Sequence, residues 1–265
     1  MRSLKKAPRI DRGSGYVGST VPIFLKQARK HEKDCINAHP EILGLIERLN
    51  AAFNSLTSRA VDGPALPALM LGDAHCSFLA AVRSALSGQI PVAFMALRGS
   101  IESGLYGFIM TRDKSTEWAW IGRKSDRGLC RRTFSASRGL TLLKEIDPDL
   151  ALFLHESYEA AIDNGAHPNF PGISGQLMFD EYDAANKISH IYLHPHDAIP
   201  VVTALRACVE TGMAVASLFR YVMPKHPPAL KADRTARQVY VAYRAYRDAA
   251  GDKGSDRLAG ISESR

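Results

Sequence analysis

Residues 89–111 read QIPVAFMALRGSIESGLYGFIMT, a stretch in which most positions are apolar. Pro91 suits the first turn of a helix, because the N–H that it lacks has no partner within the helix at that position. A helix that is apolar on all sides is packed on all sides, so the stretch predicts a central buried helix. Arg98 and Glu102 interrupt it. A mid-membrane arginine costs roughly 2.5–3.5 kcal/mol, so we do not expect a membrane span here.

Arg98 and Glu102 are four residues apart and therefore share one face of this helix. On a buried helix each charge must find a partner or lose several kcal/mol to desolvation. Small residues around them, such as Gly99 and Ser103, allow a neighbouring helix or a ligand to come close. Two interpretations follow: an ion pair that fixes how the helix packs, or a polar site that binds something.

The bulk composition is that of a globular protein. The chain has 265 residues, of which 46% are hydrophobic and 23% are charged, so one domain with appendages is expected. Four cysteines stand far apart without a CxxC motif, and the basic N-terminus lacks the apolar region of a secretory signal. We therefore expect free thiols and a cytoplasmic location, with no membrane partner.

Apolar periodicity and capping residues predict a mostly helical chain. The two most apolar helices, 89–111 and 196–223, are expected to pack together in the core. Alternation at 176–183 and 188–193, with a turn at 183–187, predicts a small β-hairpin on the side of the bundle. Asp147 is the expected N-cap of the helix that follows it. The other predicted helices are 22–35, 40–59, 65–87, 115–123, 129–134, 138–146, 148–164 and 230–250.

The fold class predicted from these elements is all-α, a multi-helix bundle with a small β-hairpin. We expect a flexible basic arm at 1–20, the helical domain at 21–223, and a Pro-rich linker, a basic helix and a disordered tail at 224–265. In the short helix at 115–123, Trp118 and Ile121 are expected to face the core.

The formal net charge is +7, and it is concentrated in two regions. Residues 1–33 hold nine Lys/Arg residues against Asp11 and Glu32, and residues 123–138 hold six against Asp126 alone. Such clusters attract polyanions, although they can also be merely solvated. The candidate binding arginines are Arg127, Arg131 and Arg132.

Two catalytic alternatives have partial support in the sequence. His155, Glu156 and Glu159 on one helix and His190, His194 and His196 after the hairpin are residue types that bind metals, but the HExxH spacing is absent. Helical nucleases of the HEPN type use an Arg and a His separated by four to six residues, and Arg220 and His226 have that spacing. Pro224 lies between them and should end the helix. No motif for a nucleotide or other cofactor is found, and we expect neither a cofactor nor a metal.

Three features of the sequence are considered together. They are Leu97-Arg98 with Glu102 on an apolar helix, a later segment with tryptophans, and His167-Pro168-Asn169 before a last long apolar helix. By these features, residues 65–222 resemble a set of uncharacterised all-helical bacterial proteins that are often met on plasmids or mobile elements. The resemblance implies that Arg98, Glu102 and His167 are polar positions that recur in those proteins. It implies no particular activity for this chain.

Two hypotheses follow from the sequence. In the first, the protein acts by binding, with nucleic acid as a partner for its basic ends. In the second, it is an enzyme whose pocket contains Arg98, Glu102 and His167, with Asn169 as a binding residue in the same loop. The oligomeric state is not indicated by the sequence.

Overall fold

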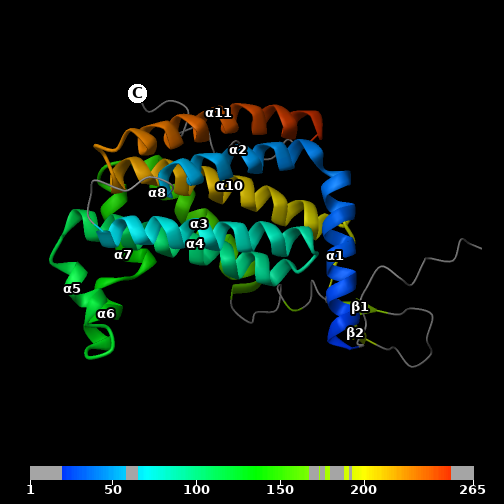
Figure 1. Ribbon diagram of the computed structural model, residues 1–265, viewed down its shortest axis with the longest axis horizontal. Helices are drawn as coiled ribbons and strands as arrows, with labels where there is room; N and C mark the ends of the chain where they lie inside the picture. The colour runs from blue at the N-terminus through cyan, green and yellow to red at the C-terminus, as the bar shows by residue number, and fades with distance from the viewer. Residues whose placement is uncertain are drawn as a thin grey trace, which may run out of the picture.

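The computed structural model describes residues 20–57, 65–166, 173, 177–179, 188–190 and 193–251. Nearly all of these residues are helical, and most of the long helices lie side by side as a bundle (Figure 1). The predicted all-α fold class is thereby confirmed. The helices are α1 (Val21–Ala38), α2 (Pro40–Thr57), α3 (Ala65–Leu86), α4 (Ile90–Arg112), α5 (Thr116–Ile121), α6 (Arg127–Thr133), α7 (Ala136–Lys144), α8 (Pro148–Ala161), the π-helical turn η1 (Ile162–Ala166), α10 (Ile199–Val222) and α11 (Pro227–Ala249).

Helix α4 is the predicted central helix, and 13 of its 23 residues are buried. It contacts α3, α7, α8 and α10, so it forms the middle of the bundle. The expectation that it is packed on all sides is wrong at one edge. Val92 and Met95 are exposed there, and Arg98 and Glu102 are only partly buried. Along this edge α8 contacts the charged pair through Tyr158, whose hydroxyl donates to Glu102, and the Arg98 and Glu102 side chains each stay 25% exposed.

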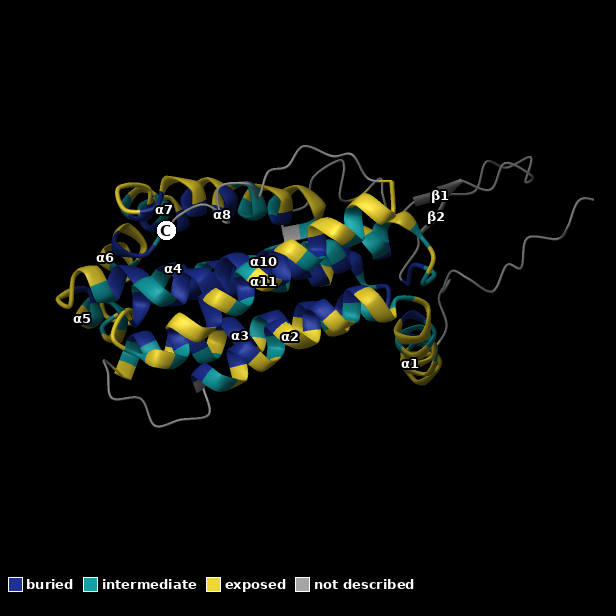
Figure 2. Ribbon diagram, turned by 90° about the horizontal axis from the view of Figure 1, so that it is seen from above, coloured by how far each residue is buried: buried dark blue, intermediate teal, exposed yellow. Residues whose placement is uncertain are grey.

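Helix α10 is the second core helix, and 15 of its 24 residues are buried. In Figure 2 it lies in the middle of the bundle and much of its ribbon is dark blue. It crosses α4 closely because α4 has Gly104 at the contact. A Cβ atom at this position would lie 3.2 Å from Leu218 Cδ2 and 3.5 Å from Val215 Cγ1. The prediction that the two most apolar helices pack together is confirmed.

Helix α11 lies along α10 and α2 rather than apart from the bundle. Ala232, Ala236, Val239 and Tyr243 from α11 are buried in the same core cluster as the residues of α4 and α10. The turn at 223–226, where the sequence predicts a linker, therefore joins two helices of one core.

The short helices α5 and α6 project from one end of the bundle, while α1 lies across the opposite end (Figure 1). The sequence-based expectation for α5 is wrong. Trp118 is 75% exposed and Ile121 is 58% exposed. Trp120 instead turns toward the bundle, where it contacts Tyr106 of α4 and Phe134. A helix of six residues has fewer than two turns, so its apolar pattern cannot show which side is buried.

The first helix is joined to the bundle through backbone carbonyls of the segment before α10. His31 Nδ1 donates to the His194 carbonyl oxygen (3.0 Å), and His39 Nε2 donates to that of His196 (2.7 Å). The His194 N–H in turn donates to the carbonyl of Gly88 (2.9 Å), in the turn between α3 and α4. Gly88 has a φ of +79°, and a side chain there would overlap the His194 carbonyl, so this turn requires glycine.

Two three-residue strands, β1 (Leu177–Phe179) and β2 (Ile188–His190), pair antiparallel, with Leu177 opposite His190. They fall within the segments 176–183 and 188–193, where the sequence predicts the strands of a hairpin. The turn predicted at 183–187 lies outside the described residues. The buried core cluster of the described residues is built almost wholly from helices.

Two of the described helices, α3 and α10, have the length and hydropathy of a membrane-spanning segment. The core helix of a soluble bundle has the same properties, and 72% of the apolar window of α10 is buried inside the protein. For α3 the buried share is 39%, and Leu69 and Leu79 are exposed on it. Length and composition thus assign neither helix to a membrane.

The close contact of α4 with α10 predicts a large effect of Gly104→Leu. The added side chain has no room beside Leu218 and Val215, so overpacking should lower the free energy of unfolding by about 1–3 kcal/mol or more. Urea denaturation followed by circular dichroism measures this change. Gly44→Leu on α2 is the matched control, because nothing lies within 4 Å of a Cβ there. It should be neutral or stabilising by up to about 1 kcal/mol. Equal effects of both substitutions would contradict the close contact.

Candidate functional site

Arg98 and Glu102 form an ion pair on α4, and Tyr158 of α8 completes it. Arg98 Nε donates to Glu102 Oε1 at 2.9 Å, and the Tyr158 hydroxyl donates to the same oxygen at 2.9 Å. The Arg98 guanidinium also lies over the Tyr158 ring, 5.4 Å from its centroid. The pair thereby links α4 to α8, and Tyr158 is a partner that the helix pattern of α4 could not reveal.

The Arg98 and Glu102 side chains are each 25% exposed, so the pair is neither sealed in the core nor free in solvent. Burial alone would lower the pKa of Arg98, but the hydrogen bond and charge of Glu102 outweigh it and raise the pKa. Burial, followed by the hydrogen bond to Glu102, raises the pKa of Tyr158. At neutral pH Arg98 is therefore a cation and Tyr158 a protonated phenol.

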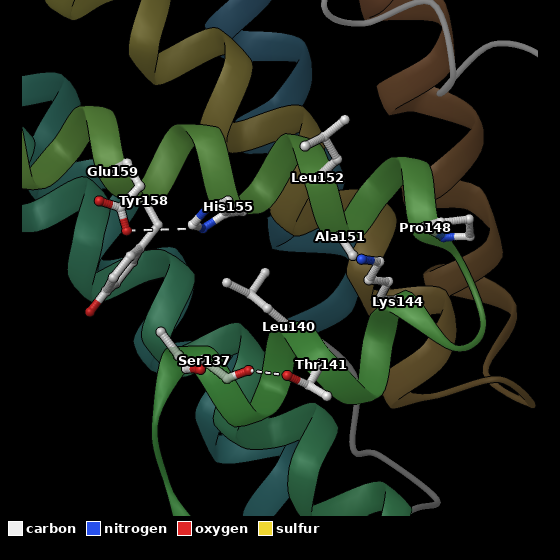
Figure 3. Close-up of a pocket in the computed structure, with 11 residues that line it drawn as sticks. Ser137, Leu140, Thr141, Lys144, Pro148, Ala151, Leu152, His155, Tyr158 and Glu159 are labelled. Carbon is white, nitrogen blue, oxygen red and sulfur yellow. Dashed lines mark hydrogen bonds and ion pairs between the residues drawn. The ribbon is translucent and has the colours of Figure 1, made fainter.

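A pocket of about 420 Å³ lies between α7 and α8, and Tyr158 belongs to its wall. Figure 3 shows Ser137, Thr141 and Lys144 on the α7 side and His155 and Glu159 on the α8 side. The apolar part of the lining includes Ala136, Leu140, Ala151 and Leu152. This volume admits a small molecule, with apolar surface on the floor and both charge signs at the rim.

Among the described residues, no cluster of metal-ligating side chains supports the metal-binding hypothesis. His155 Nδ1 and Glu159 Oε1 are 3.9 Å apart, and no group of three or more metal-ligating side chains gathers there. His194 is buried, and burial lowers its pKa, which favours a neutral ring. The His190 side chain lies outside the described residues. His167 and Asn169, the predicted partners of Arg98 and Glu102, lie outside them too, so their roles stay predictions.

Arg220 takes part in a buried charge network that the sequence did not indicate. Its guanidinium binds Asp147 Oδ2 at 2.7 Å and Asp233 Oδ2 at 3.2 Å. The Tyr221 hydroxyl donates to Asp147 Oδ2 at 2.8 Å, and Arg237 binds Asp233 at 3.3 Å. These side chains come from the start of α8, the end of α10 and the first turns of α11, so the network joins three helices.

The spacing between Arg220 and His226 does not produce a nuclease-like pair on one helix. α10 ends at Val222, before Pro224, and His226 is the residue that precedes α11. Arg220 is only 17% exposed and is held by two carboxylates. Asp147 also fulfils its predicted role, because its Oδ1 accepts the N–H of Leu150 and caps α8.

The basic lobe, which we define as residues 116–133, contains α5, the turn after it and α6. Its five cations, Arg123, Lys124, Arg127, Arg131 and Arg132, are all exposed. Among the described residues none of them lies within 4.0 Å of a carboxylate oxygen. The sixth predicted cation, Arg138, differs because it is half-buried and donates to the Thr133 carbonyl at the end of α6 (3.2 Å).

The basic lobe is anchored to α4 by an aromatic cluster. Tyr106 of α4 lies 5.8 Å from the Trp120 ring and 5.5 Å from the Phe134 ring, measured between centroids. Burial, with a smaller contribution from the charge of Glu102, raises the pKa of Tyr106 to about 12. Arg123 lies over Trp120 at 5.4 Å, and Asp126 caps α6 by accepting the Leu129 N–H. The arginines of the lobe are thus carried by an ordered element.

Four free cysteines are found, as the sequence suggested. Cys35 and Cys208 are buried, and burial raises the pKa of Cys35 to about 11 and that of Cys208 to about 12. Both thiols are therefore protonated at neutral pH, and Cys208 is a core residue rather than a nucleophile. Cys76 is exposed and Cys130 is half-buried.

Comparisons of the chain with family models, curated proteins and solved structures give no match. The resemblance to plasmid-type helical proteins therefore stays a prediction. The assignment of function depends on the chain's own geometry, namely the Arg98–Glu102–Tyr158 group, the α7–α8 pocket and the basic lobe.

The charge network at Arg220 predicts that Asp147→Asn is strongly destabilising. The amide would leave Arg220 without one of its two carboxylates. The free energy of unfolding should therefore fall by about 2–4 kcal/mol, between the cost of an unsatisfied buried group and that of a broken buried ion pair. Asp126→Asn is the control, since Asp126 is an exposed helix cap that forms no ion pair with any of the described residues. It should change stability by less than about 0.5 kcal/mol. Similar values for both variants in urea denaturation would contradict a structural role of the network.

Proposed function

We propose that the protein acts by binding nucleic acid and that the basic lobe is the contact. The observation that supports this proposal is the set of five exposed cations on one projecting element, none of which has a carboxylate partner in the part of the chain that the structure describes. Unpaired cations keep their full charge for an external polyanion, and phosphates release counterions when they bind. The free cysteines are compatible with a reducing compartment, so we place the protein in the cytoplasm.

Arginine outnumbers lysine in the basic lobe by four to one. A guanidinium forms two parallel hydrogen bonds to a phosphate and stacks on planar groups, which an ammonium cannot do. Arg127 and Arg131 are one helical turn apart on α6, so they project from the same side at a separation along the axis of about 6 Å. This spacing allows both to contact one backbone.

The other basic region of the sequence, residues 1–33, is represented in the structure by α1. Lys26, Arg29, Lys30 and Lys33 are exposed on α1, at the opposite end of the bundle from the basic lobe (Figure 1). Residues 1–19 lie outside the described part. We assign α1 no separate site, because Glu32 and Asp34 stand among its cations. The cations of α1 therefore serve as the control for the loss of net charge in the experiment below.

The triple variant Arg127→Gln, Arg131→Gln, Arg132→Gln should lose affinity for nucleic acid. We expect more than a roughly tenfold loss at ~0.1 M salt and a slope of log K against log salt that is smaller by about 2 to 3. Fluorescence anisotropy with a labelled oligonucleotide, repeated over a salt series, gives both values.

The matched control is Arg29→Gln, Lys30→Gln, Lys33→Gln, which removes the same charge from α1. It should retain most of the affinity, because the proposal assigns binding to the basic lobe. Equal losses in the two triple variants would show a response to net charge rather than a site. Absence of salt-dependent binding in the wild-type protein would refute the proposal outright.

A second candidate function is an enzyme or ligand-binding protein with its site around Arg98, Glu102 and Tyr158. The observation that favours it is the pocket between α7 and α8, whose wall includes Tyr158. Tyr158 connects this pocket to the Arg98–Glu102 pair through its hydrogen bond to Glu102. His167 remains the predicted third polar residue of the site.

The pocket hypothesis predicts that filling the pocket prevents ligand binding. A screen of small metabolites by thermal shift should yield a compound that stabilises the wild-type protein but not Leu140→Trp, in which the indole occupies the pocket. Leu129→Trp, on the exposed side of α6, is the control and should respond like the wild type. A compound that stabilises all three proteins equally binds elsewhere and contradicts this candidate.

A further inference from the structure

The basic lobe contains an exposed tryptophan that packing does not explain. Trp118 is 75% exposed, and Ile121 and Leu129 nearby in the lobe are 58% and 43% exposed. Trp120, two residues away, is held between Tyr106 and Phe134 and already anchors the lobe. The packing of the fold therefore does not require an indole at position 118. Trp118 lies in the basic lobe together with the exposed arginines.

We propose that the basic lobe binds single-stranded nucleic acid, with Trp118 as the platform on which a base stacks. This inference rests on the proposed function and names its ligand class. An exposed indole in the same lobe as exposed guanidinium groups provides the two features that single strands require, a π-face for a base and cations for the backbone. Every base has such a face, so the binding depends little on sequence.

A duplex fits the same surface less well. The bases of a duplex are stacked on one another, so their faces are not available to a side chain such as Trp118. Helix α6 has seven residues and is about 10 Å long, and its exposed polar side chains are mainly arginines, which suit phosphates. A single strand can present bases to Trp118 while its phosphates contact Arg127 and Arg131.

The experiment measures tryptophan fluorescence and affinity with a mixed-sequence single-stranded oligonucleotide and with the matching duplex. Binding of the single strand should quench the fluorescence of the wild-type protein, and Trp118→Phe should lose most of the quenching while keeping most of the affinity. Trp118→Ala should lower the affinity for the single strand roughly 5- to 150-fold, the equivalent of one stacked base. Its affinity for the duplex should change less than threefold. Trp118 is exposed, so these variants should fold, and circular dichroism checks that they do.

The outcomes separate this inference from the proposed function. Salt-dependent binding that is lost in the Arg127/Arg131/Arg132 variant but unchanged in Trp118→Ala overturns the stacking platform and leaves the basic lobe as a nucleic-acid site. Equal effects of Trp118→Ala on single strand and duplex also overturn it. If no oligonucleotide binds and only vesicles rich in anionic lipid quench Trp118, the surface is a membrane contact and both proposals fail.

Discussion

The contact between α4 and α10 constrains the rest of the structure. These two helices carry a large share of the buried residues of the core. They approach closely because Gly104 of α4 has no side chain to hold it away from Val215 and Leu218 of α10. Helices α3, α7 and α8 pack against α4, and α2 and α11 pack against α10. A similar close approach recurs at Gly139 of α7, where a Cβ atom would lie 2.9 Å from Leu105 Cβ. The positions of the outer helices, and of the polar groups that they carry, therefore follow from one central pair.

Charge is distributed over this core in two different ways. Arg98 and Glu102 lie at the edge of α4 and keep part of their exposure, with Tyr158 as a shared partner. Arg220 is buried more deeply, and it holds Asp147 and Asp233 in a network that joins α8, α10 and α11. Removing one partner of a buried pair costs several kcal/mol, so the second group is the structural one. The first is accessible enough to face a ligand.

Much of the fold could be predicted because helices leave local signals. Apolar spacing located α4 and α10 to within a few residues, and Asp147 before Pro148 identified the start of α8. The orientation of Trp118 was predicted wrongly, because α5 is too short for periodicity to define a buried side. The pairing of Arg220 with Asp147 and the hydrogen bond from Tyr158 to Glu102 were missed, because the partners lie 73 and 56 positions apart in sequence. The exposed arginines at 127, 131 and 132 could be found from charge alone, whereas their lack of carboxylate partners required the structure.

The protein joins a helical core to one projecting element that carries exposed cations and an exposed indole. Hydrogen exchange with mass spectrometry, with and without a single-stranded oligonucleotide, tests this division most directly. Amides of α4 and α10 should exchange slowest in the free protein, and the oligonucleotide should slow exchange mainly within the basic lobe, residues 116–133. Protection that appears instead in α1 or along the α7–α8 pocket, with residues 116–133 unchanged, would contradict this assignment of the binding surface.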